Sequence, residues 1–213
     1  MNSGLEESKS DRAYRELRHR LIMLDIQPGA AINEASLTGG GLGRTPIREA
    51  LKRLESDHLV VSYPRRGTFA ANVDITDLAE IYEVRQLLEP LGARKAAEGI
   101  SAQLRSEFED LVTELRQAST EQDKRRLLEL DLEAHRLIYR ALDNRHLAET
   151  LERLDDLATR IWCLVQTRLP DFGDSIGEHI NLLRAIMDGD ADRAAELAAD
   201  HVRHFEAVIR GAL

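Results

Sequence analysis

An aspartate and three histidines in the second half of the chain have the residue types of a metal site. Asp131 precedes His135 by four residues, so on a helix both side chains project from the same face. His179 and His201 each belong to the apolar stripe of a further helical segment. Imidazole and carboxylate groups bind first-row divalent metals, and ligands on helices can leave positions open for water or a carboxylate. Together the four residues predict a divalent metal site.

The simpler alternative for each of these histidines is a core residue bonded to a neighbouring carbonyl. For one histidine taken alone this explanation is favoured. For the set it is weaker, because several inward polar groups need partners and Asp131 with His135 forms a compact pair of ligands. The remaining histidines are interpreted as surface or capping residues: His19, His58, His146 and His204. Trp162 is interpreted as part of a bundle core or a dimer interface.

The candidate ligands lie in a part of the chain that has helical periodicity throughout and no strand pattern. Residues 76–213 therefore predict an all-α bundle, preceded by a linker at 71–75. Asp74 or Thr76 can cap the first helix, and Asp188-Gly-Asp190 predicts a helix end followed by a new N-cap. The expected helices are 76–98, 102–118, 121–142, 145–168, 172–188 and 190–211.

A basic amphipathic helix is predicted over residues 44–55. Thr45 is its expected N-cap and Pro46 its first helical residue. Its apolar stripe consists of Ile47, Ala50, Leu51 and Leu54, and its outer cations are Arg44, Arg48, Lys52 and Arg53. Such a helix is suited to a DNA groove. The alternative is a solvated helix in which Glu49 pairs with Arg53.

A short hairpin follows this helix. Residues 59–63 and 68–71 are β-prone, and Pro64-Arg-Arg-Gly67 between them forms a turn in which Gly67 can take a positive φ. Arg65 and Arg66 at the tip could reach phosphates or enter a minor groove. A helix followed by a basic hairpin predicts a winged helix-turn-helix over residues 10–72, after a disordered tail at 1–9.

Charge and composition agree with a DNA-binding head on an acidic body. The 213 residues carry a net charge of −9. Residues 1–72 hold 11 Lys and Arg against 9 Asp and Glu, whereas residues 73–213 hold 18 against 29. No apolar run approaches the ~20 residues of a membrane span, and no signal peptide opens the chain. With Cys163 as the single cysteine, a cytoplasmic protein is expected.

The basic segment resembles the DNA-binding domain of the GntR family of bacterial transcription regulators. The resemblance rests on Arg44-Thr-Pro-Ile-Arg-Glu-Ala-Leu, Arg53-Leu-Glu, Leu59-Val and Arg65-Arg-Gly-Thr-Phe69. It implies a homodimer that reads two half-sites of a near-palindromic DNA operator. By position it implies DNA contacts from Arg44, Arg48 and Arg53, a phosphate contact from Thr45, and Gly67 at the wing tip.

Two departures from the family pattern surround the basic helix. A glycine-rich segment at 39–43 replaces the end of the usual second helix, which should therefore be short or frayed. This leaves open whether the segment weakens DNA binding. His58 stands where the family generally has a glycine, and should take a left-handed C-cap conformation.

The helical half resembles the FadR-type C-terminal (FCD) domain of the same family. The resemblance rests on Tyr82-Glu-Val-Arg-Gln-Leu-Leu-Glu89, Asp131-Leu-Glu-Ala-His135, Glu178-His179, Ala185-Ile, Gly189-Asp190 and His201. It implies that Asp131, His135, His179 and His201 bind a divalent metal. Zinc is the favoured metal, and manganese, nickel or iron are the alternatives. It also implies a small carboxylate effector in the same cavity. Arg85 could pair with that effector, or alternatively with Glu89 one turn on.

The favoured function is a ligand-responsive transcription regulator, with repression as the favoured mode, and not an enzyme. The runner-up is a helical metalloenzyme acting on a small carboxylate, for which Glu178 and Glu133 are the candidate general bases. A third interpretation is a DNA-binding protein whose helical half only dimerises.

Overall fold

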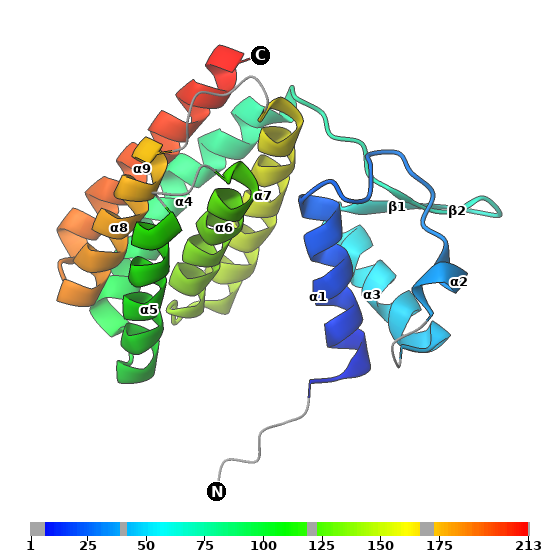
Figure 1. Ribbon diagram of the computed structural model, residues 1–213, viewed down its shortest axis with the longest axis horizontal. Coiled ribbons are helices and arrows are strands. Elements are labelled where there is room, and N and C mark those ends of the chain that lie inside the picture. Colours follow the sequence, from blue (N-terminus) through cyan, green and yellow to red (C-terminus); the bar gives the residue numbers. More distant parts are fainter. Residues whose placement is uncertain (1–6, 39–41, 119–122, 167–172, 213) are drawn as a thin grey trace, which may run out of the picture. The chain divides into compact units, whose positions relative to one another are not determined.

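The computed structural model describes residues 7–38, 42–118, 123–166 and 173–212, of which 173–175 are described by their backbone alone. It divides into an N-terminal unit, built on the residues up to Asp74 and grouped with Thr159–Cys163, and a helical unit that contains the other residues from Ile75 on (Figure 1). The mainly α fold, with a winged helix-turn-helix followed by a helical domain, confirms the predicted class.

The N-terminal unit contains three helices and a two-stranded antiparallel sheet. They are α1 (Lys9–Ile22), α2 (Glu34–Leu37), α3 (Arg44–Ser56), β1 (Val60–Tyr63) and β2 (Gly67–Ala70). Helix α3 packs on α1, and its apolar stripe is buried as the sequence predicts. The strands pair from Val60 opposite Ala70 to Tyr63 opposite Gly67. The basic turn therefore lies at the tip of the hairpin.

Helix α3 begins earlier than predicted. Its N-cap is Gly43, which makes no side-chain capping bond, and Thr45 is the second helical residue rather than the cap. Pro46 accordingly occupies the third position. The chain tolerates it there because the first four N–H groups of a helix have no intrahelical acceptor. The expected threonine cap is wrong, since a proline can be accommodated anywhere in that first turn.

The residues on either side of α3 show the short second helix and the left-handed His58 that the sequence predicts. Helix α2 has four residues, with the Asn33 side chain accepting a hydrogen bond from the Ala35 N–H. Residues 39–41 lie outside the described part of the chain. His58 has a φ of 62° and Gly67 a φ of 96°, as predicted for a C-cap and a turn. Helix α1 begins at Lys9 with Ser8 as its cap, so the predicted tail at 1–9 extends too far.

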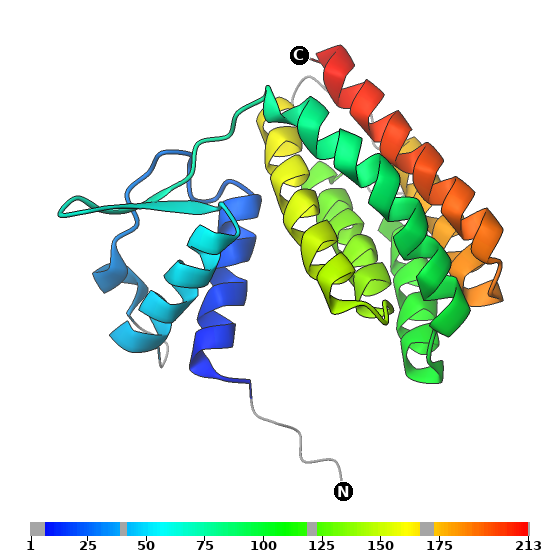
Figure 2. The ribbon, with the colours of Figure 1, turned by 180° about the vertical axis from the view of Figure 1, so that it is seen from behind.

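The helical unit contains the remaining helices, whose bounds agree with the predicted ones to within a few residues. They are α4 (Asp77–Gly99), α5 (Ala102–Ala118), α6 (Lys124–Arg140), α7 (Arg145–Val165), α8 (Gly173–Asp188) and α9 (Ala191–Ala212). Helices α4 and α9 lie side by side, as Figures 1 and 2 show, and α4 also packs on α6 and α8. Helices α6, α8 and α9 thus come together around one interior.

Polar caps determine where the site helices begin. Asp123 accepts hydrogen bonds from the N–H groups of Arg125 and Arg126 at the start of α6, and Asn144 caps α7. Gly189, at a φ of 73°, ends α8 before α9 starts at Ala191.

Trp162 on α7 is buried. None of the described helices is long and apolar enough to cross a membrane.

Candidate metal centre and nucleic-acid interface

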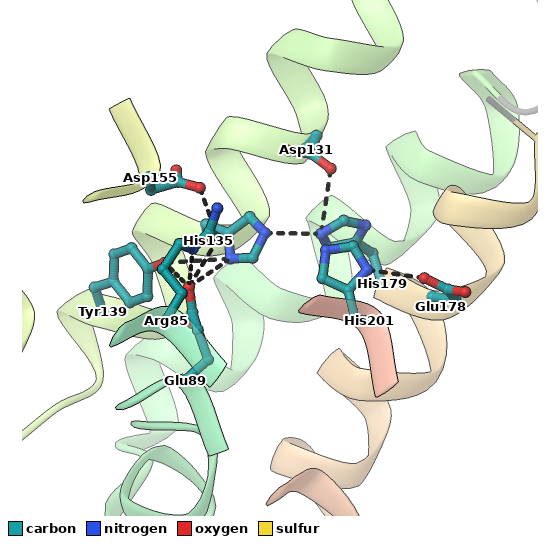
Figure 3. Close-up of polar contacts among 9 residues, drawn as sticks. All are labelled: Arg85, Glu89, Asp131, His135, Tyr139, Asp155, Glu178, His179 and His201. Carbon is teal, nitrogen blue, oxygen red and sulfur yellow. Dashed lines mark hydrogen bonds and ion pairs between the residues drawn. The ribbon is translucent and has the colours of Figure 1, made fainter. Parts of the chain in front are cut away.

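The predicted aspartate and histidines meet in the interior of the helical unit. Asp131 and His135 come from α6, His179 from α8 and His201 from α9, and all four are buried. One ligand atom from each lies within 4.8 Å of the others. Figure 3 shows the three imidazole rings converging beneath the Asp131 carboxylate. Four residues separated by up to 70 positions in the chain therefore form one compact donor set.

The distances within the cluster fit a divalent ion. The Nε2 atoms of His135 and His179 are 3.4 Å apart, and His179 Nε2 is 3.5 Å from Asp131 Oδ1. Ligand atoms placed ~2.1 Å from a tetrahedral ion are themselves ~3.4 Å apart. Asp131 Oδ1 is buried without a hydrogen-bond partner. A buried carboxylate oxygen lacking a partner is costly unless a cation satisfies it.

The outer nitrogens of two of the rings have their own partners. His201 Nδ1 lies 2.9 Å from Glu178 Oε2. His135 Nδ1 lies 3.4 Å from the Tyr139 hydroxyl and 4.0 Å from Glu89 Oε1. When Nδ1 carries the proton, the Nε2 lone pair is available to a metal. These contacts therefore favour the tautomers in which His135 and His201 present Nε2 to the interior.

A buried ionic network lies beside His135. Arg85 donates from Nε and Nη2 to Glu89 Oε1 at 3.0 and 2.8 Å, and its Nη2 is 2.9 Å from Asp155 Oδ1. The Tyr139 hydroxyl donates to the same Glu89 oxygen at 2.6 Å. The helix pair of Arg85 with Glu89, one of its two predicted roles, is thus formed. The other role, effector binding, stays a prediction.

Burial governs the protonation of this interior. It raises the pKa of Asp131 from 3.8 to about 6 and that of Asp155 to about 8. Burial, reinforced by Arg85, lowers the pKa of His135 well below 6.5. Burial, reinforced by His179, also lowers the pKa of His201. The interior therefore disfavours charge on each of these groups and keeps the two imidazoles in the neutral form that binds metals.

The local charge balance also suits a divalent cation. Beside the cluster, Arg85 is one buried cation paired with the buried carboxylates of Glu89 and Asp155, and the carboxylate of Asp131 lies in the same interior. If all three ionise, two negative charges remain uncompensated. A divalent ion on Asp131 and the histidines would balance them, so the residues present fit a metal.

The Glu178 carboxylate contacts His201 and His204 and is thereby occupied by two imidazoles. It is half-buried, bonds His201 through Oε2, and bonds His204 Nδ1 through Oε1 at 2.5 Å. Its partial burial would raise its pKa, but the hydrogen bonds from His201 and His204 lower it below its usual value. Glu133, the other base suggested for a metalloenzyme, is exposed.

We expect Glu178→Gln to weaken divalent-metal binding by about 10- to 100-fold, because a neutral amide is a weaker acceptor than the carboxylate that orients His201. A competition titration with a chromogenic chelator would measure this. Glu133→Gln is the matched control, since it makes the same change at an exposed glutamate and should bind metal like the parent protein. Equal affinities for all three proteins would exclude the orienting role.

The predicted DNA-contacting residues lie on two exposed elements of the N-terminal unit. Arg44, Thr45, Arg48 and Arg53 are exposed on α3, and Arg65, Arg66 and Gly67 are exposed at the hairpin tip. At the tip, Arg65 takes a left-handed φ of 64°. The contact of these exposed residues of α3 and of the hairpin tip with DNA stays a prediction.

Two of these arginines have partners within the unit. Arg48 Nε lies 2.9 Å from Glu34 Oε2 on α2. Arg53 lies 2.6 Å from Asp11 on α1, with its guanidinium carbon 3.9 Å from the Tyr14 ring centre. The predicted alternative pairing of Arg53 with Glu49 is replaced by this contact with α1. Both arginines are therefore oriented by neighbouring helices.

Some residues around the Asp-His cluster were not assigned to it from the sequence. Glu89 was predicted only as a helix partner of Arg85, and Tyr139 lies one turn from His135, a spacing that was the available signal. Asp155 lies on α7, where a pair of adjacent aspartates resembles an ordinary solvated helix face. His204 is exposed as predicted, yet it joins the cluster's outer contacts through Glu178.

Comparisons with known proteins agree with this architecture. The model of the bacterial regulatory proteins of the gntR family matches residues 9–70, and the FCD domain model matches residues 80–204. The Nta operon transcriptional regulator of Aminobacter aminovorans is 28% identical over 198 residues, which cover 90% of this chain and 92% of that protein. The transcriptional repressor RspR of Escherichia coli K12 is 22% identical over 202 residues, covering 94% and 89%.

A solved structure has the same fold. The E. coli protein McbR/YncC superimposes with a TM-score of 0.81 at 23% identity, over 96% of this chain and 98% of that one. The Nta operon regulator and RspR are both transcription regulators by name, and neither is named as an enzyme. The two family models together match most of the chain, and the FCD match alone covers more than half of it. The chain therefore belongs to the GntR family of bacterial regulatory proteins and is a DNA-binding transcription regulator with a C-terminal FCD domain.

Proposed function

We propose that this regulator senses a small carboxylate metabolite in a helical domain that holds a divalent metal. The observation that carries the proposal is the buried set of Asp131, His135, His179 and His201, whose donor atoms lie within 4.8 Å of one another. Zinc suits this donor set best, and manganese, nickel or iron are alternatives. A bound metal supplies a Lewis-acidic position at which a carboxylate oxygen can bind.

The surrounding residues would decide which carboxylates can enter. Arg85 is a positively charged neighbour of the cluster, but its guanidinium already contacts the carboxyl groups of Glu89 and Asp155. An effector carboxylate that pairs with Arg85 would have to replace one of these two partners. Asp155 is the more easily replaced, because its raised pKa of about 8 allows it to take up a proton and release the guanidinium.

The DNA-binding half of the proposal uses the exposed arginines of α3 and of the hairpin tip. A homodimer would place two copies of α3 on two half-sites of a near-palindromic operator. Effector binding would change the equilibrium between conformers that space these helices differently. The effector can shift that equilibrium only as far as its affinity differs between the conformers. Repression would follow where the operator overlaps a promoter.

A mobility-shift titration with the intergenic DNA upstream of the protein's own gene tests the proposed function. The metal-loaded protein should bind one fragment at least about 1000-fold more tightly than random DNA at physiological salt. A panel of small carboxylates should then include one that changes the midpoint. Binding of all fragments with the affinity of random DNA would contradict the proposal.

Metal affinity should depend on pH in a way set by Asp131. Above pH 6 its carboxylate is ionised, so the affinity should change little between pH 8 and pH 6.5. Below pH 6 the metal must displace a proton from Asp131, and affinity should fall about tenfold per pH unit. His135 and His201 add little there, because their pKa values are lowered.

Competition with a chelator of known proton affinity, from pH 8 to pH 5, would measure this dependence. Affinity that stays constant to pH 5 would argue against Asp131 as a ligand. A steep decline that already begins above pH 7 would show that the imidazoles are protonated more readily than their burial allows.

A further inference from the structure

Arg53, in the last turn of α3, contacts helix α1 and lies on a different side of α3 from Arg44 and Arg48. Successive residues of an α-helix are rotated by about 100° around its axis. Arg48 therefore lies only about 40° from Arg44, whereas Arg53 lies about 140° from Arg48 and about 180° from Arg44. When Arg44 and Arg48 enter a DNA groove, Arg53 is thus turned away from the floor of that groove.

Tyr14 on α1 contacts the C-terminal end of α3 at two points. Its ring centre lies 3.9 Å from the guanidinium carbon of Arg53, well within the range of a cation–π contact. Its hydroxyl donates a hydrogen bond of 2.7 Å to Oδ2 of Asp57, which is the C-cap residue of α3. The half-buried Tyr14 side chain therefore binds both the last turn and the cap of the same helix.

Asp11 adds a third contact from the first turn of α1, which lies beside α3 in Figure 1. Its Oδ1 accepts a hydrogen bond from Arg53 Nη1 at 2.6 Å, and its Oδ2 accepts one from the hydroxyl of Ser8, the N-cap of α1, at 2.6 Å. An exposed ion pair contributes little stability by itself. Because both of its oxygens are bonded, however, this carboxylate fixes the direction of the Arg53 guanidinium.

We propose that Arg53 and Tyr14 clamp α3 on α1, and that Arg53 positions the DNA-reading end of α3 without touching DNA. The inference rests on the proposed DNA-binding function, and it replaces the direct contact that the family resemblance implies for Arg53. The N-terminal residues of a recognition helix meet the base edges in the major groove. A helix fixed at its C-terminal end holds Arg44 and Arg48 in one orientation, on which discrimination between operator and other DNA depends.

The salt dependence of DNA binding separates a positioning arginine from one that contacts a phosphate. On a random-sequence duplex, Arg53→Ala should keep the parent's slope of log affinity against log salt concentration, whereas loss of one phosphate contact would reduce that slope by about one. On the operator, Arg53→Ala and Tyr14→Leu should each lose about 5- to 30-fold of the preference over random DNA, the size expected for one ring contact. The double variant should lose no more than Tyr14→Leu alone, because both changes remove the same contact.

Two control variants accompany these proteins. Tyr14→Phe keeps the ring beside Arg53 and removes only the hydroxyl, so it should lose less operator preference than Tyr14→Leu. Arg145→Ala removes an arginine of the helical unit that is also exposed and paired with a carboxylate, and it should bind both kinds of DNA like the parent. Circular dichroism would establish that each variant is folded. Arg53→Ala changes an exposed side chain, so its salt slope decides between the two roles even if Tyr14→Leu does not fold.

A salt slope reduced by about one in Arg53→Ala would overturn the proposal. A folded Tyr14→Leu protein that keeps the parent's operator preference would overturn it as well. Both results leave the proposed function intact, because the parent protein still prefers its operator. A parent protein without any operator preference would refute the proposed function and the clamp together.

Discussion

Asp131→Asn is expected to abolish high-affinity metal binding while making the metal-free protein more stable. The substitution removes a charged ligand from the cluster, so the affinity should fall by more than about 100-fold, the upper end of the effect of changing an outer-sphere partner. Its effect on stability has the opposite sign. Burial raises the Asp131 pKa from 3.8 to about 6, so ionising this group in the folded protein above pH 6 costs about 3 kcal/mol.

The stability difference should depend on pH as follows. The folded protein retains a proton on Asp131 at pH values where the unfolded chain has lost it, so the destabilisation appears as pH rises from about 4 to about 6. At pH 8 the metal-free asparagine variant should be more stable than the parent by up to about 3 kcal/mol, and at pH 4 the two should be similar. Denaturant unfolding of chelator-treated proteins would measure this difference.

Asp143→Asn supplies the control for Asp131→Asn. Asp143 is an exposed aspartate just beyond the end of α6, so its amide variant should keep both the metal affinity and the stability of the parent. If Asp131→Asn bound zinc as tightly as the parent, the carboxylate would not be a ligand. If its metal-free form were less stable at pH 8, the assumed cost of burying the Asp131 charge would be wrong.

Arg48→Ala is expected to lose about 1–3 kcal/mol of specific DNA binding, equivalent to about 5- to 150-fold in affinity. Arg48 is exposed on α3, and its guanidinium can bind two acceptors of a guanine together. Its pair with Glu34 at 2.9 Å is exposed on both sides and contributes little. In the parent protein, exchanging Glu34 for a DNA base therefore costs little free energy. In the Arg48→Ala variant, discrimination between bases at one operator position should be weaker.

Fluorescence anisotropy with the operator and with single-base variants of it would measure the loss. Arg145→Ala, an exposed arginine at the start of α7 in the helical unit, should bind both kinds of DNA like the parent. An Arg48→Ala protein that keeps the parent's full sequence preference would show that base recognition comes from other residues. A uniform weakening on operator and random DNA alike would assign Arg48 to a phosphate.

The position of the cluster of Asp131, His135, His179 and His201 could be predicted because helical spacing limits where side chains point. Asp131 and His135, four residues apart, must share a face, and the apolar neighbours of His179 and His201 place both on inward stripes. The helix bounds followed from the same periodicity. The family resemblance then connected ligands on three separate helices, which spacing within one helix cannot do.

The charged surroundings of the cluster could not be predicted for a related reason. Asp155 belongs to a segment whose acidic pattern is typical of a solvated face, and only its tertiary contact with Arg85 makes it a buried group. The N-cap of α3 was predicted at Thr45 because threonine before proline is a common helix start. In the structure α3 already begins at Arg44, and Gly43 is its N-cap. For Asp155, tertiary packing thus overrides the local pattern.

The account depends most on a divalent metal held by Asp131, His135, His179 and His201. Its most direct test is elemental analysis of the protein purified without chelators, followed by titration of the stripped protein with zinc, manganese, nickel and iron. We expect close to one divalent ion per chain in the parent protein and less than about a tenth of that in Asp131→Asn. A parent protein that contains no metal and takes up none of the four ions would contradict the account.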